Sequence, residues 1–292
     1  MQKREIARMT DTENLKEGYK LFLPLAEQGD SDMQCRIGLM YAGGLGVLQD
    51  YKEALKWYQL AAKQGNVDAQ SNLGAMYSQG QGIPQDFKEA IKWYCLAAEQ
   101  GNVDSQFILG EMCFDGQGIG KDNVKALKWY QLAANQGDAE AQYSVGMFYL
   151  NGEEVPQDYL EAAKWFGLAA NQGNVTAQRN LAGLCSEGLG VLQDKKEATK
   201  WYRLSADQGE EYAQYFLGFM YALGEGVPQD NKEAVKFFRM SAEQGNADAQ
   251  FELGHMHSEG LGVLKDYVVA QMWFNLSASN GNKDALVMGM SL

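Results

Sequence analysis

The chain has 292 residues, a formal net charge of −13 and 46% hydrophobic residues. This charge argues against nucleic-acid binding, which needs a concentrated basic surface. The sequence holds no apolar run of about 18 residues, and the opening MQKREIARMT is charged, so neither a membrane span nor a signal peptide is predicted. We therefore expect a cytoplasmic protein, or a periplasmic or secreted one if a leader has been removed.

Four cysteines, too few and too scattered for a disulfide framework, are interpreted as free thiols in a reducing compartment. They are Cys35, Cys95, Cys113 and Cys185.

A repeated unit of 36 residues organises the chain, marked by a glycine that recurs from Gly29 to Gly281 without insertion or deletion. A period of this length is typical of a solenoid, in which each repeat packs on its neighbours. Residues 1–28 are predicted to be an N-terminal cap with half a repeat, and residues 281–292 a partial C-terminal repeat. The seven complete repeats are 29–64, 65–100, 101–136, 137–172, 173–208, 209–244 and 245–280.

Each repeat contains two helical patterns. In residues 65–100, the first helix is expected to start at Asn66 or Asp68, to bury one face, and to end at Gly80 in a left-handed conformation. The second helix is expected to start at Asp86, with Glu89 completing a capping box. The sequence thus predicts an all-α fold of seven helix-turn-helix repeats.

Aromatic and small residues recur with the same period. The tryptophans, with Phe237 in the missing place, are interpreted as core residues because alanines share their stripe. They are Trp57, Trp93, Trp129, Trp165, Trp201 and Trp273. A glycine inside the first helix of six repeats predicts a close approach of another helix, since glycine there costs about 1 kcal/mol. Ala182 replaces this glycine in the fifth repeat, and we expect that repeat to be slightly splayed there, with its helices further apart.

The repeat resembles the Sel-1-like repeat family, which is related to the tetratricopeptide repeats, and its bacterial members in particular. The resemblance rests on a pattern that recurs over some 250 residues. In one repeat it reads Ala69, Leu73, Gly74, Tyr77, Gly80, Gly82, Ile83, Pro84, Asp86, Ala90, Trp93, Ala97, Ala98 and Gly101. It implies an α/α solenoid wound as a right-handed superhelix that serves as an adaptor or scaffold. Departures are Glu154 for a loop glycine, and Cys113, Cys185 and His257 for tyrosine.

Catalytic and ligand sites have weak support. The segment GQGIGKD at 116–122 lacks the spacing of a phosphate loop and follows a helix. His255 and His257, two residues apart on a helix, diverge and so do not suit one metal ion. The recurrent carboxylates occupy capping positions. We predict no catalytic residue, no metal and no cofactor; a small-ligand or cell-wall-related enzyme is the alternative from another class.

Positions that vary between repeats are the candidate binding residues. The packing that every repeat shares does not determine which residue they hold, so they are free to contact a partner. On the first helices they form one face, which the resemblance places on the concave side of the solenoid. Aromatic residues and arginine are common anchors of interfaces, although packing against the next repeat's first helix is the alternative explanation. The candidate residues are Phe107, Tyr143, Met147, Arg179, Tyr215, Phe216, Phe219 and Phe251.

We therefore expect a non-catalytic scaffold that binds a peptide or protein in this groove, with Arg179 reaching an acidic or carbonyl group of the partner. A basic partner is one option. A toxin-neutralising immunity protein or a host-interaction factor of a bacterium is the alternative within this class. Binding to nucleic acid or membrane is not expected, and the oligomeric state is not determined by the sequence.

Overall fold

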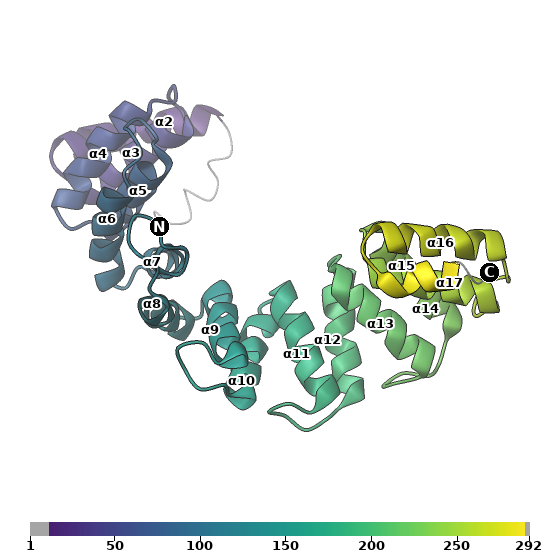
Figure 1. Ribbon diagram of the computed structural model, residues 1–292. Helices are drawn as coiled ribbons and strands as arrows, with labels where there is room; N and C mark the ends of the chain where they lie inside the picture. Colours follow the sequence, from purple (N-terminus) through teal and green to yellow (C-terminus); the bar gives the residue numbers. More distant parts are fainter. Residues whose placement is uncertain (1–11, 290–292) are drawn as a thin grey trace. The chain divides into compact units, whose positions relative to one another are not determined.

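The computed structural model describes residues 12–289, which form sixteen α-helices and contain no strand (Figure 1). The chain divides into two units, residues 1–138 and 139–292. Unit 1 contains α2 (Thr12–Glu27), α3 (Ser31–Gly43), α4 (Tyr51–Lys63), α5 (Val67–Gln79), α6 (Phe87–Glu99), α7 (Val103–Asp115) and α8 (Asn123–Asn135). Unit 2 contains α9 (Ala139–Asn151), α10 (Tyr159–Asn171), α11 (Val175–Glu187), α12 (Lys195–Asp207), α13 (Glu211–Leu223), α14 (Asn231–Glu243), α15 (Ala247–Glu259), α16 (Tyr267–Ser279) and α17 (Lys283–Gly289).

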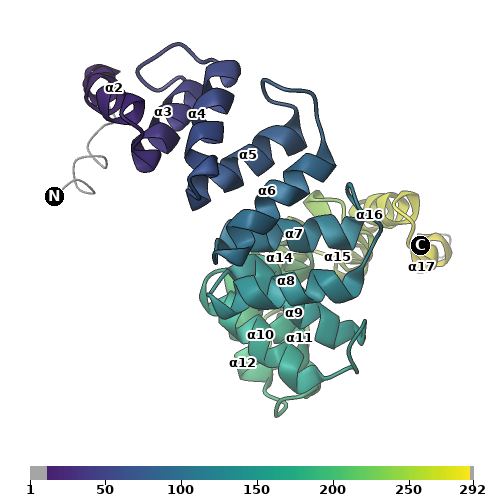
Figure 2. The same cartoon turned by 90° about the vertical axis from the view of Figure 1, so that its left-hand side faces the viewer.

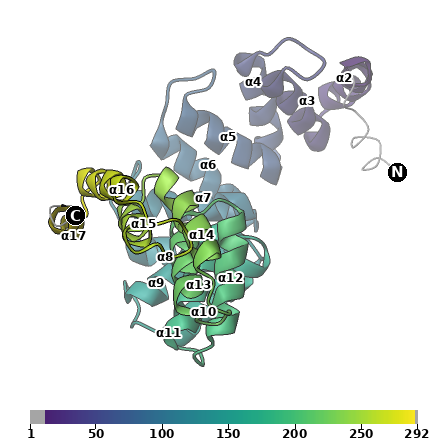
Figure 3. The ribbon, with the colours of Figure 1, turned by 90° about the vertical axis from the view of Figure 1, so that its right-hand side faces the viewer.

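Within each unit, helices that follow one another in the chain pack side by side (Figures 2 and 3). Each predicted repeat is one pair, a first helix such as α11 and a second helix such as α12. The helix α2, within the segment predicted to be a cap with half a repeat, packs on α3 and buries Ala26; residues 1–11 of that segment lie outside the described part. After Gly281, α17 follows, and its Ala285 packs against Phe274.

The helix ends follow the sequence with one exception. Asn66 caps α5 by accepting from the amide of Ala69 at 2.9 Å, and Gly80 ends it at φ 69°. Asp86 caps α6 as predicted, but its own amide donates to the carbonyl of Tyr77 at 2.9 Å. Glu89 instead pairs with Lys92. The second half of the predicted capping box is therefore wrong, because the turn already supplies an acceptor for that amide.

The core of each repeat is centred on the aromatic residue that follows the tryptophan position. In α10 this is Phe166, which is fully buried, as are its equivalents Tyr58, Phe238 and Phe274. The tryptophans are half-buried; Trp93 packs against the cluster around Tyr58 in the preceding repeat. The tryptophans thus lie at the edge of the core, and each is only partly buried in it.

The helical glycines are explained by that ring. A Cβ at Gly146 would lie 2.7 Å from Cδ1 of Phe166, which confirms the predicted close approach. In the fifth repeat, which has Ala182, the Tyr202 ring instead stacks on Phe216 at 5.3 Å between centroids. The predicted splaying is wrong, since α11 and α12 pack as the other pairs do.

Glutamines that the sequence analysis did not single out link successive repeats. Nε2 of Gln208, at the end of α12, donates to Oε1 of Gln178 at 2.9 Å. Nε2 of Gln178, in α11, donates to the carbonyl of Ala170 in the preceding repeat at 3.1 Å. The same relay runs through Gln244 and Gln214, at 2.8 Å. The nitrogen and the oxygen of this buried side-chain amide both have hydrogen-bond partners. The amide therefore fixes the position of each repeat against the preceding one.

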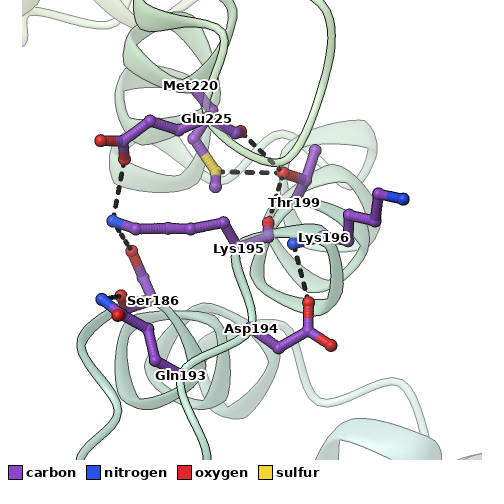
Figure 4. A network of polar contacts seen from close by, with 8 residues as sticks. All are labelled: Ser186, Gln193, Asp194, Lys195, Lys196, Thr199, Met220 and Glu225. Atoms are coloured by element: carbon purple, nitrogen blue, oxygen red, sulfur yellow. Dashed lines mark hydrogen bonds and ion pairs between the residues drawn. The ribbon is translucent and has the colours of Figure 1, made fainter.

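The connecting loops also join neighbouring repeats, as at the start of α12 (Figure 4). Lys195 Nζ forms an ion pair with Glu225 of the next repeat at 2.8 Å and donates to Ser186 Oγ at 3.1 Å. Thr199 Oγ1 donates to the carbonyl of Lys195 at 2.8 Å. Gly226, at φ 72°, lies so close that a Cβ would be 2.1 Å from the same carbonyl oxygen. Only glycine fits this contact without a shift of backbone.

Candidate functional site

The candidate residues lie on the first helices, and all but one belong to unit 2. Phe107 is on α7 of unit 1, where its ring lies 5.6 Å from that of Tyr130. The other seven occupy four first helices, and we call the surface that they share the first-helix face of unit 2. They are Tyr143 and Met147 on α9, Arg179 on α11, Tyr215, Phe216 and Phe219 on α13, and Phe251 on α15.

Most of these aromatic rings are half-buried because each packs on the second helix of its own repeat. The ring of Tyr143 lies 5.9 Å from that of Phe166, and the ring of Phe251 lies 5.5 Å from that of Phe274. Each of these two rings thus packs on the core ring of its own repeat, and Tyr143 also borders a buried cluster that includes residues of the next first helix, α11.

The densest aromatic cluster is on α13. Tyr215 lies 5.0 Å from Phe219 and 5.3 Å from Phe216, measured between ring centroids. Phe219 makes an edge contact with the core ring of Phe238 at 5.3 Å. Phe216 is 40% exposed although it stacks on Tyr202. Edge-to-face and stacked pairs of this kind add about 0.5–1.5 kcal/mol each beyond area burial, so the cluster is a rigid platform.

Arg179 forms an ion pair within its own chain, and its contact with a partner stays a prediction. Its Nε lies 3.2 Å from Oε1 of Glu210, and its guanidinium carbon lies 5.6 Å from the ring centroid of Tyr212. Glu210 also caps α13 by accepting from the amide of Ala213 at 2.5 Å. Ion pair and cap together fix the arginine beside the aromatic cluster.

Tyr212 is a surface residue that the sequence analysis missed. It is 50% exposed and lies on the same helix as Phe216. The sequence does distinguish Tyr212, because the equivalent position is acidic in most repeats. The equivalent residues are Asp32, Asp68, Asp104, Glu140, Thr176 and Asp248.

Neighbouring side chains set the polarity of this face. Nδ2 of Asn180 donates to Sδ of Met147 at 3.3 Å. Burial raises the pKa of Tyr215 to about 12, with Asp248 and Glu252 adding to the shift. Burial also raises the pKa of Glu252. The aromatic cluster is therefore bordered by carboxylates on α15, and its surroundings are acidic.

Comparison with known proteins identifies the repeat. The Sel1 repeat pattern matches residues 31–66, 67–102, 103–138, 139–174, 175–210, 211–246 and 247–282. The chain belongs to the Sel1 repeat family. Sel1 repeat proteins generally mediate protein–protein interaction, and their fold is typically a non-enzymatic scaffold. The sequence matches no protein among those with curated descriptions.

Solved structures of Sel1 repeat proteins resemble this chain. Protein c5321, a protective antigen present in uropathogenic Escherichia coli strains, is 38% identical with a TM-score of 0.84 over 91% of this chain and 57% of the other. A Sel1 repeat protein from Oxalobacter formigenes is 36% identical with a TM-score of 0.70, covering 94% of this chain and 80% of the other. This chain thus spans little more than half the length of the Escherichia coli relative.

An immunity protein from Pseudomonas aeruginosa, Pa5087, is 22% identical with a TM-score of 0.40, covering 75% of this chain and 82% of the other. This likeness carries no argument about function.

The first helices of the Sel1 repeats in unit 1 have a different surface. A pocket of about 490 Å³ is lined by polar and acidic residues from successive first helices, among them Asp32, Asp68 and Asp104. Nδ2 of Asn66 donates to Asp32 at 2.9 Å, so at least one of these carboxylates has a partner in the chain. The pocket in unit 1 is thus mainly polar, although Phe107 on α7 is an aromatic residue at one of the variable positions of that unit.

The two histidines lie on α15, and the glycine-rich segment at 116–122 follows the end of α7. Within residues 12–289, no group of three or more His, Cys, Asp or Glu side chains is placed to hold a metal ion. Lys121 of the glycine-rich segment lies over the ring of Phe114, 4.7 Å from its centroid, beyond the end of α7. The four cysteines are free, and no helix in the described part of the chain is long and apolar enough to cross a membrane.

His257 gives the fold a predicted acid sensitivity. It is buried where four of the other six repeats have tyrosine and two have cysteine, and its pKa is lowered by burial first and then by Arg239, with Asp266 opposing. The unfolded chain, with an ordinary histidine pKa of about 6.5, therefore binds more protons than the folded chain below that pH. The contribution of His257 to stability is complete above about pH 6.5 and declines as the pH falls toward the lowered pKa.

We expect His257→Tyr to remove this loss. Urea unfolding at neutral and mildly acid pH would measure it, because the variant and the wild type share every other titrating group. The stability advantage of the variant should grow as the pH falls. If the two proteins lose stability in parallel, His257 does not titrate as its surroundings indicate.

Proposed function

We propose that this Sel1 repeat protein is a non-catalytic scaffold that binds a peptide segment of another protein on the first-helix face of unit 2. The observation that carries the proposal is the aromatic platform on α13, formed by Tyr212 with Tyr215, Phe216 and Phe219. Phe216 and Tyr212 are 40% and 50% exposed, Phe216 stacks on Tyr202, and Arg179 lies over the ring of Tyr212. Exposed aromatic residues fixed in place are typical interface anchors, because they lose little side-chain entropy on binding.

The surroundings of the platform favour a basic or mixed segment. The whole chain carries a net charge of −13, and Asp248 and Glu252 border the cluster. Arg179 is paired with Glu210, so it adds no free positive charge. Its stacking on Tyr212 positions a planar donor group at the edge of the platform. Apolar side chains of the partner would meet the rings, and basic ones the carboxylates.

The proposal is tested with peptides selected from a random library on the purified protein. Their affinities are then measured for the wild type, for Phe216→Ala and Tyr212→Ala, and for Leu204→Ala. Leu204 is a matched control, because it is 47% exposed but lies on the second helix α12. A residue that anchors an interface contributes about 1–2 kcal/mol or more, a loss of about tenfold in affinity.

The expected result is a loss of affinity in the two aromatic variants and little change in Leu204→Ala. Circular dichroism must show that each variant keeps its helices. Peptides that bind all four proteins equally, or that depend on Leu204 alone, would place the binding surface elsewhere.

A host-interaction role is a second candidate, supported by the likeness to the Escherichia coli protective antigen. It specifies the origin of the partner and uses the same face. Binding of host proteins, lost in Phe216→Ala and retained in Leu204→Ala, would support it. An immunity role has no comparable support, since the Pseudomonas aeruginosa likeness is in fold alone.

A further inference from the structure

The last complete repeat differs from the others on the outward side of its second helix. In five second helices a glutamate and a lysine three residues later form an exposed ion pair, and the lysine side chains are 56–71% exposed. In α16 the same two positions hold Val269 and Met272. The five pairs are Glu53–Lys56, Glu89–Lys92, Glu161–Lys164, Glu197–Lys200 and Glu233–Lys236.

The replacement creates an apolar stripe along α16. Val268, Met272 and Leu276 are spaced by four residues, so they lie on one side of the helix. They are 81%, 52% and 42% exposed. Leu276 has an exposed apolar equivalent in every repeat, but Met272 replaces a lysine found at that position in all six others. A depression of about 590 Å³ lies beside the stripe, lined by residues that include Tyr267 and Met272.

A further repeat stacked on the end of the array would not cover Met272. Its lysine equivalents stay exposed although another repeat follows each of them. The helix α17, which follows α16, packs on a different side through Ala285, Ala270 and Phe274. The stripe therefore faces outward whatever extends the solenoid.

The charge of this surface indicates what covers it. α16 has no Asp, Glu, Lys or Arg between Tyr267 and Ser279, whereas the chain as a whole carries −13. Two copies of the chain repel each other over most of their surfaces, and an uncharged face is where that repulsion is smallest. In a two-fold contact the same surface patch of both copies forms the interface. A charged residue near the axis would therefore lie opposite the same charged residue of the second copy.

We propose that the outward face of α16, formed by Val268, Met272 and Leu276, binds the same face of a second copy of this chain. Met272 is the middle residue of the stripe, so it lies nearest the two-fold axis. One helix face is smaller than the standard interface of about 800 Å² per partner, and the dimer is therefore weak and concentration-dependent. This surface is on a second helix, and the inference does not rest on the proposed function.

The test is sedimentation velocity over a concentration series with Met272→Lys, which installs the residue that the chain itself uses in its other repeats. The wild-type mass should rise from 32.4 kDa toward twice that value, and more readily in high salt, which screens the repulsion. Met272→Lys should stay monomeric, since it sets two like charges against each other. The control Leu96→Lys, at a 44% exposed position on α6, should associate like the wild type.

A second measurement locates the contact. Mild oxidation of Met272→Cys should give a covalent dimer faster than Lys200→Cys, the equivalent position in the fifth repeat. A wild type that remains monomeric throughout the series would overturn the proposal. So would association that Met272→Lys leaves intact, or equal cross-linking from positions 272 and 200.

Discussion

Replacing Phe166 by alanine is expected to lower the free energy of unfolding by about 3–5 kcal/mol. Phe166 is fully buried, its ring occupies the space that a side chain at Gly146 would need, and it supports Tyr143 of the first-helix face at 5.9 Å. The cost combines the lost transfer energy of the ring with the cavity left between α9 and α10. Helices this tightly paired through one ring have little room to collapse into that cavity.

Urea unfolding followed by circular dichroism measures this effect, with Phe216→Ala as the matched aromatic control. Phe216 is 40% exposed and loses its ring contacts with Tyr202 and Tyr215, so a smaller cost of about 1–2 kcal/mol is expected. If both phenylalanines cost the same, the distinction between core ring and platform ring is wrong.

Gly226→Ala is expected to cost about 2–4 kcal/mol, from left-handed backbone strain and overlap with a neighbouring backbone. The residue has φ 72°, and the new Cβ would lie 2.1 Å from the carbonyl oxygen of Lys195. A backbone atom cannot rotate away as a side chain can. The loop would have to withdraw from α12, and the 2.8 Å ion pair of Lys195 with Glu225 would be disturbed with it.

The chain supplies its own control for Gly226. Glu154 occupies the equivalent position in the fourth repeat and adopts φ 59°. Glu154→Gly would relieve about 1–2 kcal/mol of left-handed strain and lose about 0.5–1 kcal/mol through the greater freedom of unfolded glycine. Unchanged or slightly raised stability is therefore expected in urea unfolding. A marked loss in Glu154→Gly, or none in Gly226→Ala, would contradict the assignment of strain to this position.

The repeat period was enough to predict the fold because residues of the same type form the helix ends and the buried ring contacts in every repeat. Residue type and spacing alone assign Gly80 as the end of α5 and narrow the start of α5 to Asn66 or Asp68; the structure shows that Asn66 is the cap. The capping box could not be assigned in this way, because the carbonyl of Tyr77 that satisfies the amide of Asp86 comes from the preceding helix. Likewise, spacing identifies the aromatic stripe but does not decide that Tyr94 rather than Trp93 fills the centre.

The candidate site was predicted less completely, since its geometry depends on contacts between repeats. Variation between repeats identified the α13 cluster, but the pairing of Arg179 with Glu210 joins two repeats and has no local signal. Tyr212 was missed because most other repeats have an ordinary acidic helix start at this position, although the change to tyrosine is visible in the sequence. The same comparison across repeats, applied to the second helices, is what singles out Met272 on α16.

Photo-cross-linking of a selected peptide tests the central claim most directly. Benzoylphenylalanine is placed at position 212 on α13 in one protein and at position 204 on α12 in another, at sites that are 50% and 47% exposed in the wild type. We predict that the peptide is captured from position 212 and that unlabelled peptide competes for this capture, with little capture from position 204. Capture from position 204 alone, or equally from both, would contradict binding on the first-helix face of unit 2.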